Sequence, residues 1–190
     1  PEITLPHPRM TERRFVLEPL HEIAPELVLA KGGPTVSELL KNLSALRIRP
    51  VGNSPEECEE AATALNRLMP SLTENYTALK AADVARMLST GLTRIYLGRD
   101  ESGKVQAGAT LVLCCSPTGC KAWIEDVAVM PDCRRRGYGR AIIRFLIAES
   151  QRLGAKSLNL TSQPKREVAN ALYRSEGFVL RETNVYRWQK

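Results

Sequence analysis

The hydrophobic pattern of the chain changes period near residue 130, and this change marks its most informative stretch. Apolar and β-branched residues fill most of 124–129, which predicts a buried strand. Pro131 and Asp132 end that run, and from Arg140 apolar residues recur at helical spacing until Gly154. Residues 134–139 are therefore predicted to join the end of a strand to the beginning of a helix.

The same patterns predict the other elements. Helices are expected over 55–69, 75–89 and 167–173, and strands over 93–97, 105–115 and 157–161. Residues 178–180 and 185–188 are expected to form two further strands or one bent strand. Ser54 is the expected cap of the first helix. Residues 47–55 break the periodicity, so they form either the domain boundary or, at 48–51, the first strand of the domain.

The turn at 134–139 has the chemistry of an anion site. A turn from strand to helix directs backbone N–H groups and the positive end of the helix dipole at one spot. Gly137 and Gly139 lack a Cβ, so an anion can approach the main chain closely. The spacing matches neither a P-loop nor a Rossmann turn. We expect a phosphate or pyrophosphate ligand; the alternative is a surface turn whose arginines are only solvated.

Two motifs resemble those of a known family. The spacing Arg134-x-x-Gly137-x-Gly139 resembles the pyrophosphate loop of the GCN5-related N-acetyltransferases, the GNAT family, and 170–178 resembles a second signature of that family. The resemblance covers about residues 50–188. It implies an α/β fold with a central, mostly antiparallel mixed sheet flanked by helices, in a domain of residues 47–190. Residues 1–46 would be an appendage.

The resemblance also implies a reaction and a set of binding residues. Acetyl-CoA would be the co-substrate, and a primary amine would attack its thioester directly. The implied cofactor-binding residues are Val127, Ala128 and Val129 on the strand, Arg134, Arg135, Arg136, Gly137, Tyr138, Gly139 and Arg140 in the turn, and Asn170.

The general acid implied by the resemblance is Tyr173, which lies three residues after Asn170 on one helix face. A phenol has an ordinary pKa of about 10, somewhat above that of a thiol, so it can protonate a departing thiolate. The alternative is a half-buried helix aromatic with its hydroxyl in water.

Glu125 and Asp126 are the candidate general bases, because carboxylates inside an apolar strand are costly without a role or a partner. Strict alternation would place Glu125 with Trp123 and Val127, and Asp126 on the opposite face. The resemblance favours Glu125, acting directly or through water. The alternatives are an acid paired with an arginine and a mechanism without one dedicated base.

The acceptor is expected against residues 70–76 and the strand that carries Glu125. Glu74 and Glu125 hint at a cationic amine, although Glu74 also suits a solvated helix start. The tetrapeptide 124–127 resembles that of glucosamine-phosphate acetyltransferases, which makes an amino-sugar phosphate one candidate. The acceptor is otherwise open to small-molecule and peptide amines.

Residues 1–43 resemble the C-terminal end of hydroxymethyldihydropterin pyrophosphokinase. That resemblance would assign His7 and Arg13 to the triphosphate of ATP, and Phe15 to the pterin. The kinase's Asp-x-Asp magnesium signature occurs nowhere in the sequence. We therefore interpret the segment as a kinase remnant, and a chain that opens at Pro1 suits a truncated, fused or processed product.

The composition of the chain limits the classes of ligand and partner that it can bind. The formal net charge is +6, from 27 basic and 21 acidic residues, and many of the arginines cluster around 134–144. No known nucleic-acid motif appears among them, so coenzyme A accounts for the basic patch better than nucleic acid does. No apolar run reaches membrane-spanning length and no signal peptide is visible, so we expect no membrane partner and a cytoplasmic protein.

The five cysteines are odd in number and include no Cys-x-x-Cys, which argues against a disulfide framework and a zinc site. With only two histidines, no metal is expected. Cys114 and Cys115 are expected to pack as small apolar residues. Cys133, beside the arginines, could have a lowered thiol pKa.

Three functional hypotheses follow. The first is an acetyl-CoA-dependent N-acetyltransferase, the second a non-catalytic acyl-CoA-binding regulatory module, and the third a folate-pathway pyrophosphokinase fragment fused to a GNAT domain. A homodimer formed by strand exchange at the C-terminal edge is compatible with each.

Overall fold

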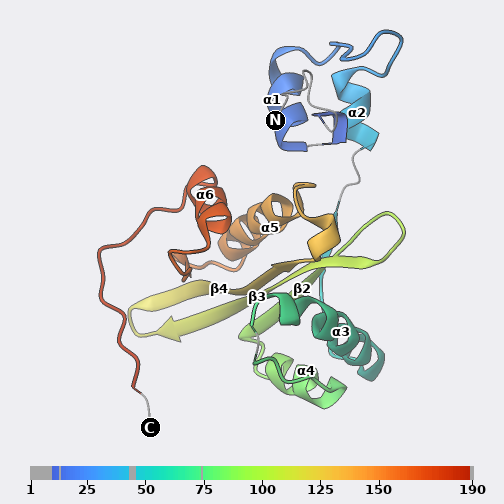
Figure 1. Ribbon diagram of the computed structural model, residues 1–190. Coiled ribbons are helices and arrows are strands. Elements are labelled where there is room, and N and C mark those ends of the chain that lie inside the picture. The colour runs from blue at the N-terminus through green and yellow to red at the C-terminus, as the bar shows by residue number, and fades with distance from the viewer. Residues whose placement is uncertain (1–9, 13, 43–45, 74, 189–190) are drawn as a thin grey trace. The chain divides into compact units, whose positions relative to one another are not determined.

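The computed structural model describes residues 10–12, 14–42, 46–73 and 75–188 (Figure 1). By its internal contacts the chain forms two units, Pro1–Leu160 and Thr161–Lys190. The expected division at residue 46 falls inside the first unit and stays a prediction.

The first unit is built on a five-stranded mixed sheet with the strand order β1-β2-β3-β4-β5. Its strands are β1 (Arg47–Pro50), β2 (Thr93–Arg99), β3 (Val105–Ser116), β4 (Gly119–Val129) and β5 (Leu158–Leu160). Neighbouring strands are antiparallel except β4 and β5, which are parallel. The predicted mixed, mostly antiparallel sheet is confirmed, and residues 47–50 form its first strand.

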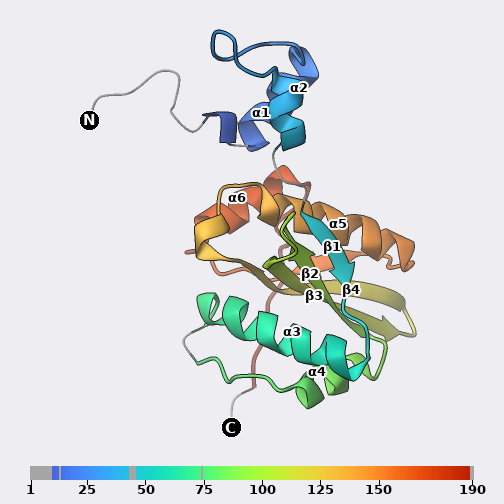
Figure 2. The ribbon, with the colours of Figure 1, turned by 90° about the vertical axis from the view of Figure 1, so that its right-hand side faces the viewer.

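Helices cover both faces of this sheet (Figure 2). On one face lie α3 (Pro55–Leu68), the 3-10 turn η2 (Met69–Ser71) and α4 (Ala81–Leu88), and on the other lies α5 (Tyr138–Arg152). Leu65, Leu68 and Val84 pack with Ile95 and Ala128 in the core on the α3 side. On the α5 side, the Tyr96 ring packs edge-on against Phe145, with ring centroids 5.2 Å apart.

The start of α3 agrees with the prediction from the sequence. The backbone N–H of Glu57 donates to the Ser54 hydroxyl at 3.2 Å, and the Glu57 carboxylate accepts from the Ser54 N–H at 3.4 Å. This capping box satisfies two N–H groups that the helix leaves without partners. Pro55 occupies the first turn, where its missing N–H costs nothing.

The helix expected over 75–89 is shorter than predicted, because residues before Ala81 are held in an extended form. The Asn66 side chain accepts from the Leu79 N–H at 2.8 Å and donates to the Leu79 carbonyl at 2.9 Å. The Tyr76 hydroxyl donates to the same Asn66 oxygen at 2.7 Å. These bonds replace helical hydrogen bonds, so α4 begins only at Ala81.

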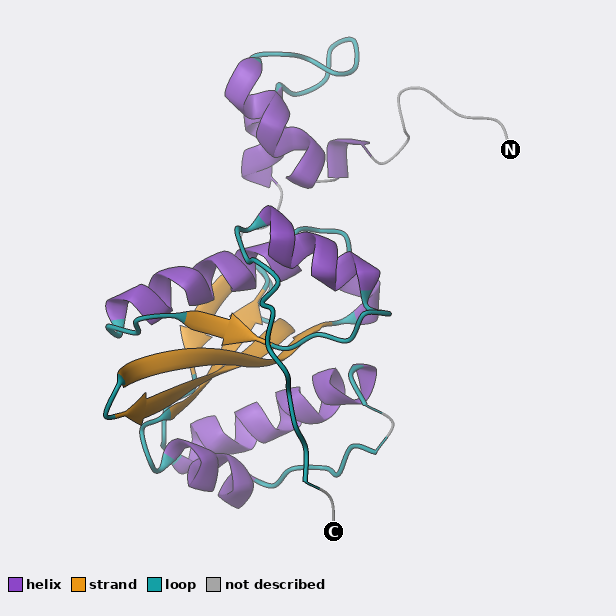
Figure 3. Cartoon of the chain, turned by 90° about the vertical axis from the view of Figure 1, so that its left-hand side faces the viewer, coloured by secondary structure: helices purple, strands orange, loops and turns teal. Residues whose placement is uncertain are grey.

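The second unit contains α6 (Glu167–Ser175), which ends before Gly177, whose φ is +88°. The strands expected over 178–180 and 185–188 are wrong: in the described part of the unit these residues form no ladder, and Figure 3 draws them as loop. Leu180 is 93% exposed and Tyr186 87%. A strand needs a hydrogen-bonding neighbour, and a short apolar stretch alone does not supply one.

The N-terminal segment holds the 3-10 turn η1 (Met10–Glu12) and two helices, α1 (Arg14–Ile23) and α2 (Val36–Asn42). Leu17 and Val36 are fully buried in it. Thr35 caps α2 by accepting from the Glu38 N–H at 3.2 Å. His7 and Arg13, assigned by resemblance to ATP, lie outside the described residues, and the side chain of Phe15 is not described.

The expectation about the cysteines is wrong in two respects. Cys115 and Cys120, which face each other across the β3–β4 hairpin, form a disulfide, and Cys114 is exposed. The pairing register of the hairpin, which no Cys-x-x-Cys pattern encodes, brings the two sulfurs together.

Candidate functional site

The most irregular part of the sheet lies where β3 pairs with the acidic part of β4. Gly108 pairs with Ala128 and Thr110 pairs with Glu125, so Asp126 and Val127 together oppose the single residue between them on β3. Two residues of β4 opposite one residue of β3 form a β-bulge. Within this bulge the backbone of Asp126 adopts the left-handed conformation, with φ +53°. The bulge brings Glu125 and Ala128 to one face, so the strict alternation expected here is wrong.

The two acidic residues of the bulge affect each other. Partial removal from water raises the pKa of the Glu125 carboxyl, and the neighbouring negative charge of Asp126 raises it further. Within the described residues, no arginine forms an ion pair with either carboxylate. A carboxylate with a raised pKa is a stronger proton acceptor, which suits a general base.

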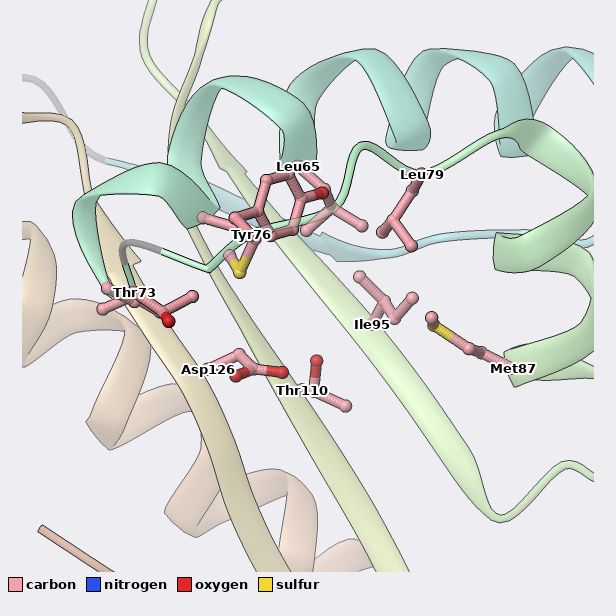
Figure 4. A pocket seen from close by; sticks show the side chains of 10 residues that line it. Leu65, Thr73, Tyr76, Leu79, Met87, Ile95, Thr110 and Asp126 are labelled. Carbon is pink, nitrogen blue, oxygen red and sulfur yellow. The ribbon is translucent and has the colours of Figure 1, made fainter.

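A pocket of about 220 Å³ opens beside the bulge, on the α3 side of the sheet (Figure 4). We call it the Asp126 pocket. Its lining residues are Leu65, Met69, Leu72, Thr73, Tyr76, Leu79, Met87, Ile95, Thr110 and Asp126. Asp126, the less favoured of the two candidate general bases, therefore faces the pocket, whereas Glu125 is not among the lining residues. Glu125 as the base stays a prediction.

Tyr76 closes the pocket opposite the strands and is fixed by its hydrogen bond to Asn66. Burial raises the pKa of its hydroxyl; the backbone hydrogen bond at Leu79 lowers it, and the charge of Asp126 raises it again. The hydroxyl therefore stays protonated and hydrogen bonded to Asn66, so Tyr76 forms part of the pocket wall. No motif in the sequence indicated Tyr76 or Asn66, because their contact depends on how 75–80 folds back on α3.

The predicted anion turn lies between the 3-10 turn η3 (Pro131–Cys133) and α5. Arg135 and Gly137 both have left-handed backbones, with φ of +64° and +82°. No side chain caps the N-terminus of α5, whose first N–H groups have no partner within the helix. Arg134, Arg135 and Arg136 are exposed around it. These features fit a phosphate or pyrophosphate.

The buried side chain of Gln106 holds the segment before the anion turn by a hydrogen bond to Cys133. The Cys133 thiol donates to the Gln106 side-chain oxygen at 3.3 Å, and the Gln106 amide donates to Asp100 at 2.6 Å. Burial raises the pKa of the Cys133 thiol, and Asp132 raises it further, so the expected lowering is wrong. Cys133 is a buried donor here, and a single glutamine in an apolar strand gave no signal in the sequence.

The edge of β4 is open next to this turn. The ladder between β4 and β5 covers only three pairs and ends at Ile124 and Leu160. Beyond it, Val127, Ala128 and Val129 have a strand neighbour on the β3 side alone among the described residues. The second edge of this stretch presents backbone groups to which an extended, amide-bearing ligand can add like a strand.

In the second unit, Asn170 and Tyr173 lie on α6. The Asn170 amide donates to the carbonyls of Gln163 and Pro164, at 3.0 and 3.4 Å, and so holds the turn before the helix. The Tyr173 ring packs edge-on against Phe178, with centroids 6.0 Å apart. Burial raises the pKa of the Tyr173 hydroxyl, and Arg166 partly offsets this. The roles of both residues stay predictions.

Two kinds of feature are absent from the described residues. No three His, Cys, Asp or Glu side chains among them are grouped as a metal site would require. None of the described helices is long and apolar enough to cross a membrane.

Comparison with known proteins gives a family match. A model described as the acetyltransferase (GNAT) family matches residues 63–178. A solved Agrobacterium tumefaciens structure, assigned as an acetyltransferase, is 27% identical with a TM-score of 0.65, covering 75% of this chain and 99% of that one. An aminoglycoside acetyltransferase from an uncultured soil metagenomic sample has a TM-score of 0.66 at 17% identity, covering 76% and 95%, and it shows the fold alone.

Curated relatives match only over short stretches. The ribosomal protein bS18-alanine N-acetyltransferase of Escherichia coli K12 is 40% identical over 58 residues, which is 30% of this chain and 39% of that enzyme. The 2-amino-4-hydroxy-6-hydroxymethyldihydropteridine pyrophosphokinase of Synechocystis is 43% identical over 49 residues, which is 26% of this chain and 25% of that enzyme. Each match spans less than half of the relative.

Proposed function

The chain belongs to the acetyltransferase (GNAT) family, and from this premise we propose that it moves the acetyl group of acetyl-CoA to a primary amine by direct attack. The observation that carries the proposal is the open edge of β4, which leads into the anion turn. A pantetheine arm needs an extended backbone to pair with, and a pyrophosphate needs converging N–H donors. One continuous stretch, 125–139, supplies both.

In this proposal the co-substrate lies along that stretch. The main chain of Val127, Ala128 and Val129 pairs with the pantetheine arm, and one of their N–H groups stabilises the thioester oxygen as it gains negative charge. The pyrophosphate is held by the anion turn. The residues assigned to it are Arg134, Arg135, Arg136, Gly137, Tyr138, Gly139 and Arg140, with Asn170 contributing from α6.

The proton transfers are assigned to two side chains. Glu125 accepts protons from the amine, directly or through water, and Tyr173 donates its proton to the sulfur of coenzyme A. A C–N bond forms as the C–S bond breaks. The acceptor begins as an ammonium ion, so its nitrogen loses two protons in one cycle. One of them replaces the proton that Tyr173 gave away, and the other is released to water.

The first experiment titrates the full chain with acetyl-CoA while its melting temperature is measured, with ATP and magnesium run alongside. Saturable stabilisation is expected from acetyl-CoA, about 2.7 kcal/mol at a hundredfold excess over the dissociation constant. A response to ATP with none to acetyl-CoA would reject the acetyltransferase and favour the pyrophosphokinase interpretation of the N-terminal segment.

The second experiment separates an enzyme from a non-catalytic binding module. Tyr173→Phe should lower the rate of thiol release by about 10²–10⁴-fold while acetyl-CoA binding is retained, because it removes only the general acid. Tyr186→Phe is the matched control, since Tyr186 lies in the same unit and is 87% exposed. Binding without turnover by the unaltered chain, across a broad amine panel, would favour the regulatory module.

The amine panel should include a peptide that begins with alanine. One curated relative acts, by its name, on an alanine of a ribosomal protein. Its match to this chain is too short to assign that acceptor, so the peptide enters the panel beside small amines.

A further inference from the structure

We infer that the Asp126 pocket takes a small monoamine with a short apolar body, and that Asp126 is the counter-ion of its ammonium group. This inference rests on the proposed function and names the acceptor class for the same site. Three observations carry it: the side chains that line the pocket, the single charge among them, and the backbone conformation at Asp126.

The walls of the pocket are mostly apolar. Six of its ten lining residues are aliphatic or thioether side chains: Leu65, Met69, Leu72, Leu79, Met87 and Ile95. They come from α3, η2, α4, β2 and the extended segment before α4, so apolar surface surrounds the bound group from several elements. The two methionines add side chains that adapt to the shape of an apolar ligand.

Four lining residues carry a polar group, Thr73, Tyr76, Thr110 and Asp126, and the last two lie on strands. Figure 4 shows Asp126 and Thr110 side by side on β4 and β3, across the pocket from Leu65 and Tyr76. The Tyr76 hydroxyl already donates to Asn66. Asp126 is therefore the one charged group among the described residues that line the pocket. A carboxylate in this position makes a charge-assisted hydrogen bond with an ammonium group.

The same lining disfavours two other classes of acceptor. No lysine or arginine is among the described lining residues, so the phosphate of an amino-sugar phosphate would have no counter-charge there. An aminoglycoside would place several hydroxyl and ammonium groups against aliphatic side chains, and each polar group left there without a partner would weaken binding. An acceptor with one ammonium group and an apolar remainder brings neither a phosphate without a counter-charge nor polar groups without partners into the pocket.

The size of the pocket limits the apolar body. Its volume of about 220 Å³ lies below the roughly 300–1,000 Å³ typical of sites for drug-sized ligands. The pocket therefore suits the amine and a short chain or a single ring.

The backbone at Asp126 allows its charge to be tested separately from its shape. Asp and Asn tolerate the left-handed region better than other residues with a side chain. Asp126→Asn therefore keeps the φ of +53° accessible and removes only the negative charge. Glu101→Gln, at an exposed position in the β2–β3 turn, is the matched control for loss of one negative charge.

The test compares acceptors by the kcat/KM of thiol release, using the full chain. Hexylamine and 1,6-diaminohexane differ only in a second ammonium group at the apolar end. Three further acceptors represent the other classes: glucosamine 6-phosphate for amino-sugar phosphates, sisomicin for aminoglycosides, and an alanine-initiated peptide for peptide amines. We expect hexylamine to exceed each of them by at least about tenfold, because a buried unpaired charge or polar group costs about 1.4 kcal/mol or more. Asp126→Asn should raise the KM for hexylamine by about 10–100-fold with acetyl-CoA binding unchanged.

A second variant guards against simple loss of folding. Met87 is 38% exposed, so Met87→Glu is expected to fold, and it places a carboxylate at the apolar end of the pocket. It should lower kcat/KM for hexylamine and raise it for 1,6-diaminohexane, whereas Met87→Leu should keep the original order. Hexylamine should also stabilise the chain against heat, which is a readout that does not need turnover.

The outcomes separate the two proposals. If acetyl-CoA binds and glucosamine 6-phosphate, sisomicin or the peptide is the best acceptor, the acetyltransferase stands and the apolar monoamine is rejected. If acetyl-CoA binds but Asp126→Asn leaves the KM for hexylamine unchanged, the role of Asp126 is rejected. If acetyl-CoA neither binds nor reacts, the proposed function fails, and this inference fails with it.

Discussion

The bulge at Asp126 and the anion turn at 134–139 lie a few residues apart in the sequence. Both contain left-handed backbone conformations, but a cationic ligand is proposed for the first and an anionic ligand for the second. Asp126 in the bulge, and Arg135 and Gly137 in the turn, adopt left-handed backbone conformations. In the turn this conformation stands beside three exposed arginines and the uncapped N-terminus of α5. In the bulge it brings a carboxylate to the wall of an apolar pocket. On these two proposals, the groups around a local backbone irregularity, and not the irregularity itself, set the sign of its ligand.

The two regions also differ in their support. The anion turn is tied to the sheet through the Cys133–Gln106–Asp100 chain of hydrogen bonds. The Asp126 pocket is closed by Tyr76 and Leu79, which hydrogen bond to Asn66 of α3. We therefore expect substitutions in one region to affect one substrate and leave the other largely unchanged.

The largest effect is expected from Gly137→Val. A β-branched residue disfavours the φ of +82° that Gly137 adopts, so the N–H donors of the turn would move. The loss of two charge-assisted hydrogen bonds predicts about a 100-fold lower affinity for acetyl-CoA, measured by calorimetry. Gly154→Val is the control, because Gly154 has a φ of +71° at the opposite end of α5. Equal losses in both variants would contradict a binding role for the turn.

A smaller effect on stability is expected from Asp126→Val. Valine in the left-handed region should lower the free energy of unfolding by about 1–3 kcal/mol, as measured by urea denaturation. Asp126→Gly removes the same carboxylate without that strain, so it should unfold close to the unaltered chain. If the two variants lose the same stability, the backbone at Asp126 is not the cause.

The anchor behind the anion turn should have a moderate effect. Gln106→Leu leaves the Cys133 thiol without its acceptor and removes one donor from Asp100, so it should cost about 1 kcal/mol of stability. It should also raise the KM for acetyl-CoA a few-fold, while the KM for the amine stays constant. Gln151→Leu on the exposed side of α5 is the control. A change in the amine KM alone would contradict the division between the two regions.

The smallest expected effect is a shift in the pH dependence. Glu125 must be ionised to accept a proton, so kcat/KM should fall as the pH drops through its raised pKa. Asp126→Asn removes one cause of that raised pKa, so the acidic limb should move to lower pH. Glu101→Gln should leave the limb in place. An unmoved limb in Asp126→Asn would argue that Glu125 is not the titrating base.

How far the sequence predicted each feature depended on whether local residues were sufficient to form it. The Ser54 cap of α3 and the turn from strand to helix at 134–139 were predicted well, because each is built by residues a few positions apart. The Cys115–Cys120 disulfide was missed although its partners are equally close, since only the hairpin register places them opposite each other. The C-terminal strands were predicted from short apolar stretches, but a strand also requires a neighbour that its own residues cannot provide.

The sequence by itself determined the family, the order of the elements in the sheet unit, and the turn from strand to helix at 134–139, because glycines, caps and apolar periods act over short distances. Only the tertiary structure decided which acid faces the pocket. The extra residue in β4 is defined by its pairing with β3, and a one-residue shift in register reverses the faces that alternation would assign. The pocket itself required Asn66 to hold the segment before α4 in an extended form. Contacts between distant segments set both features, and neither leaves a motif in the sequence.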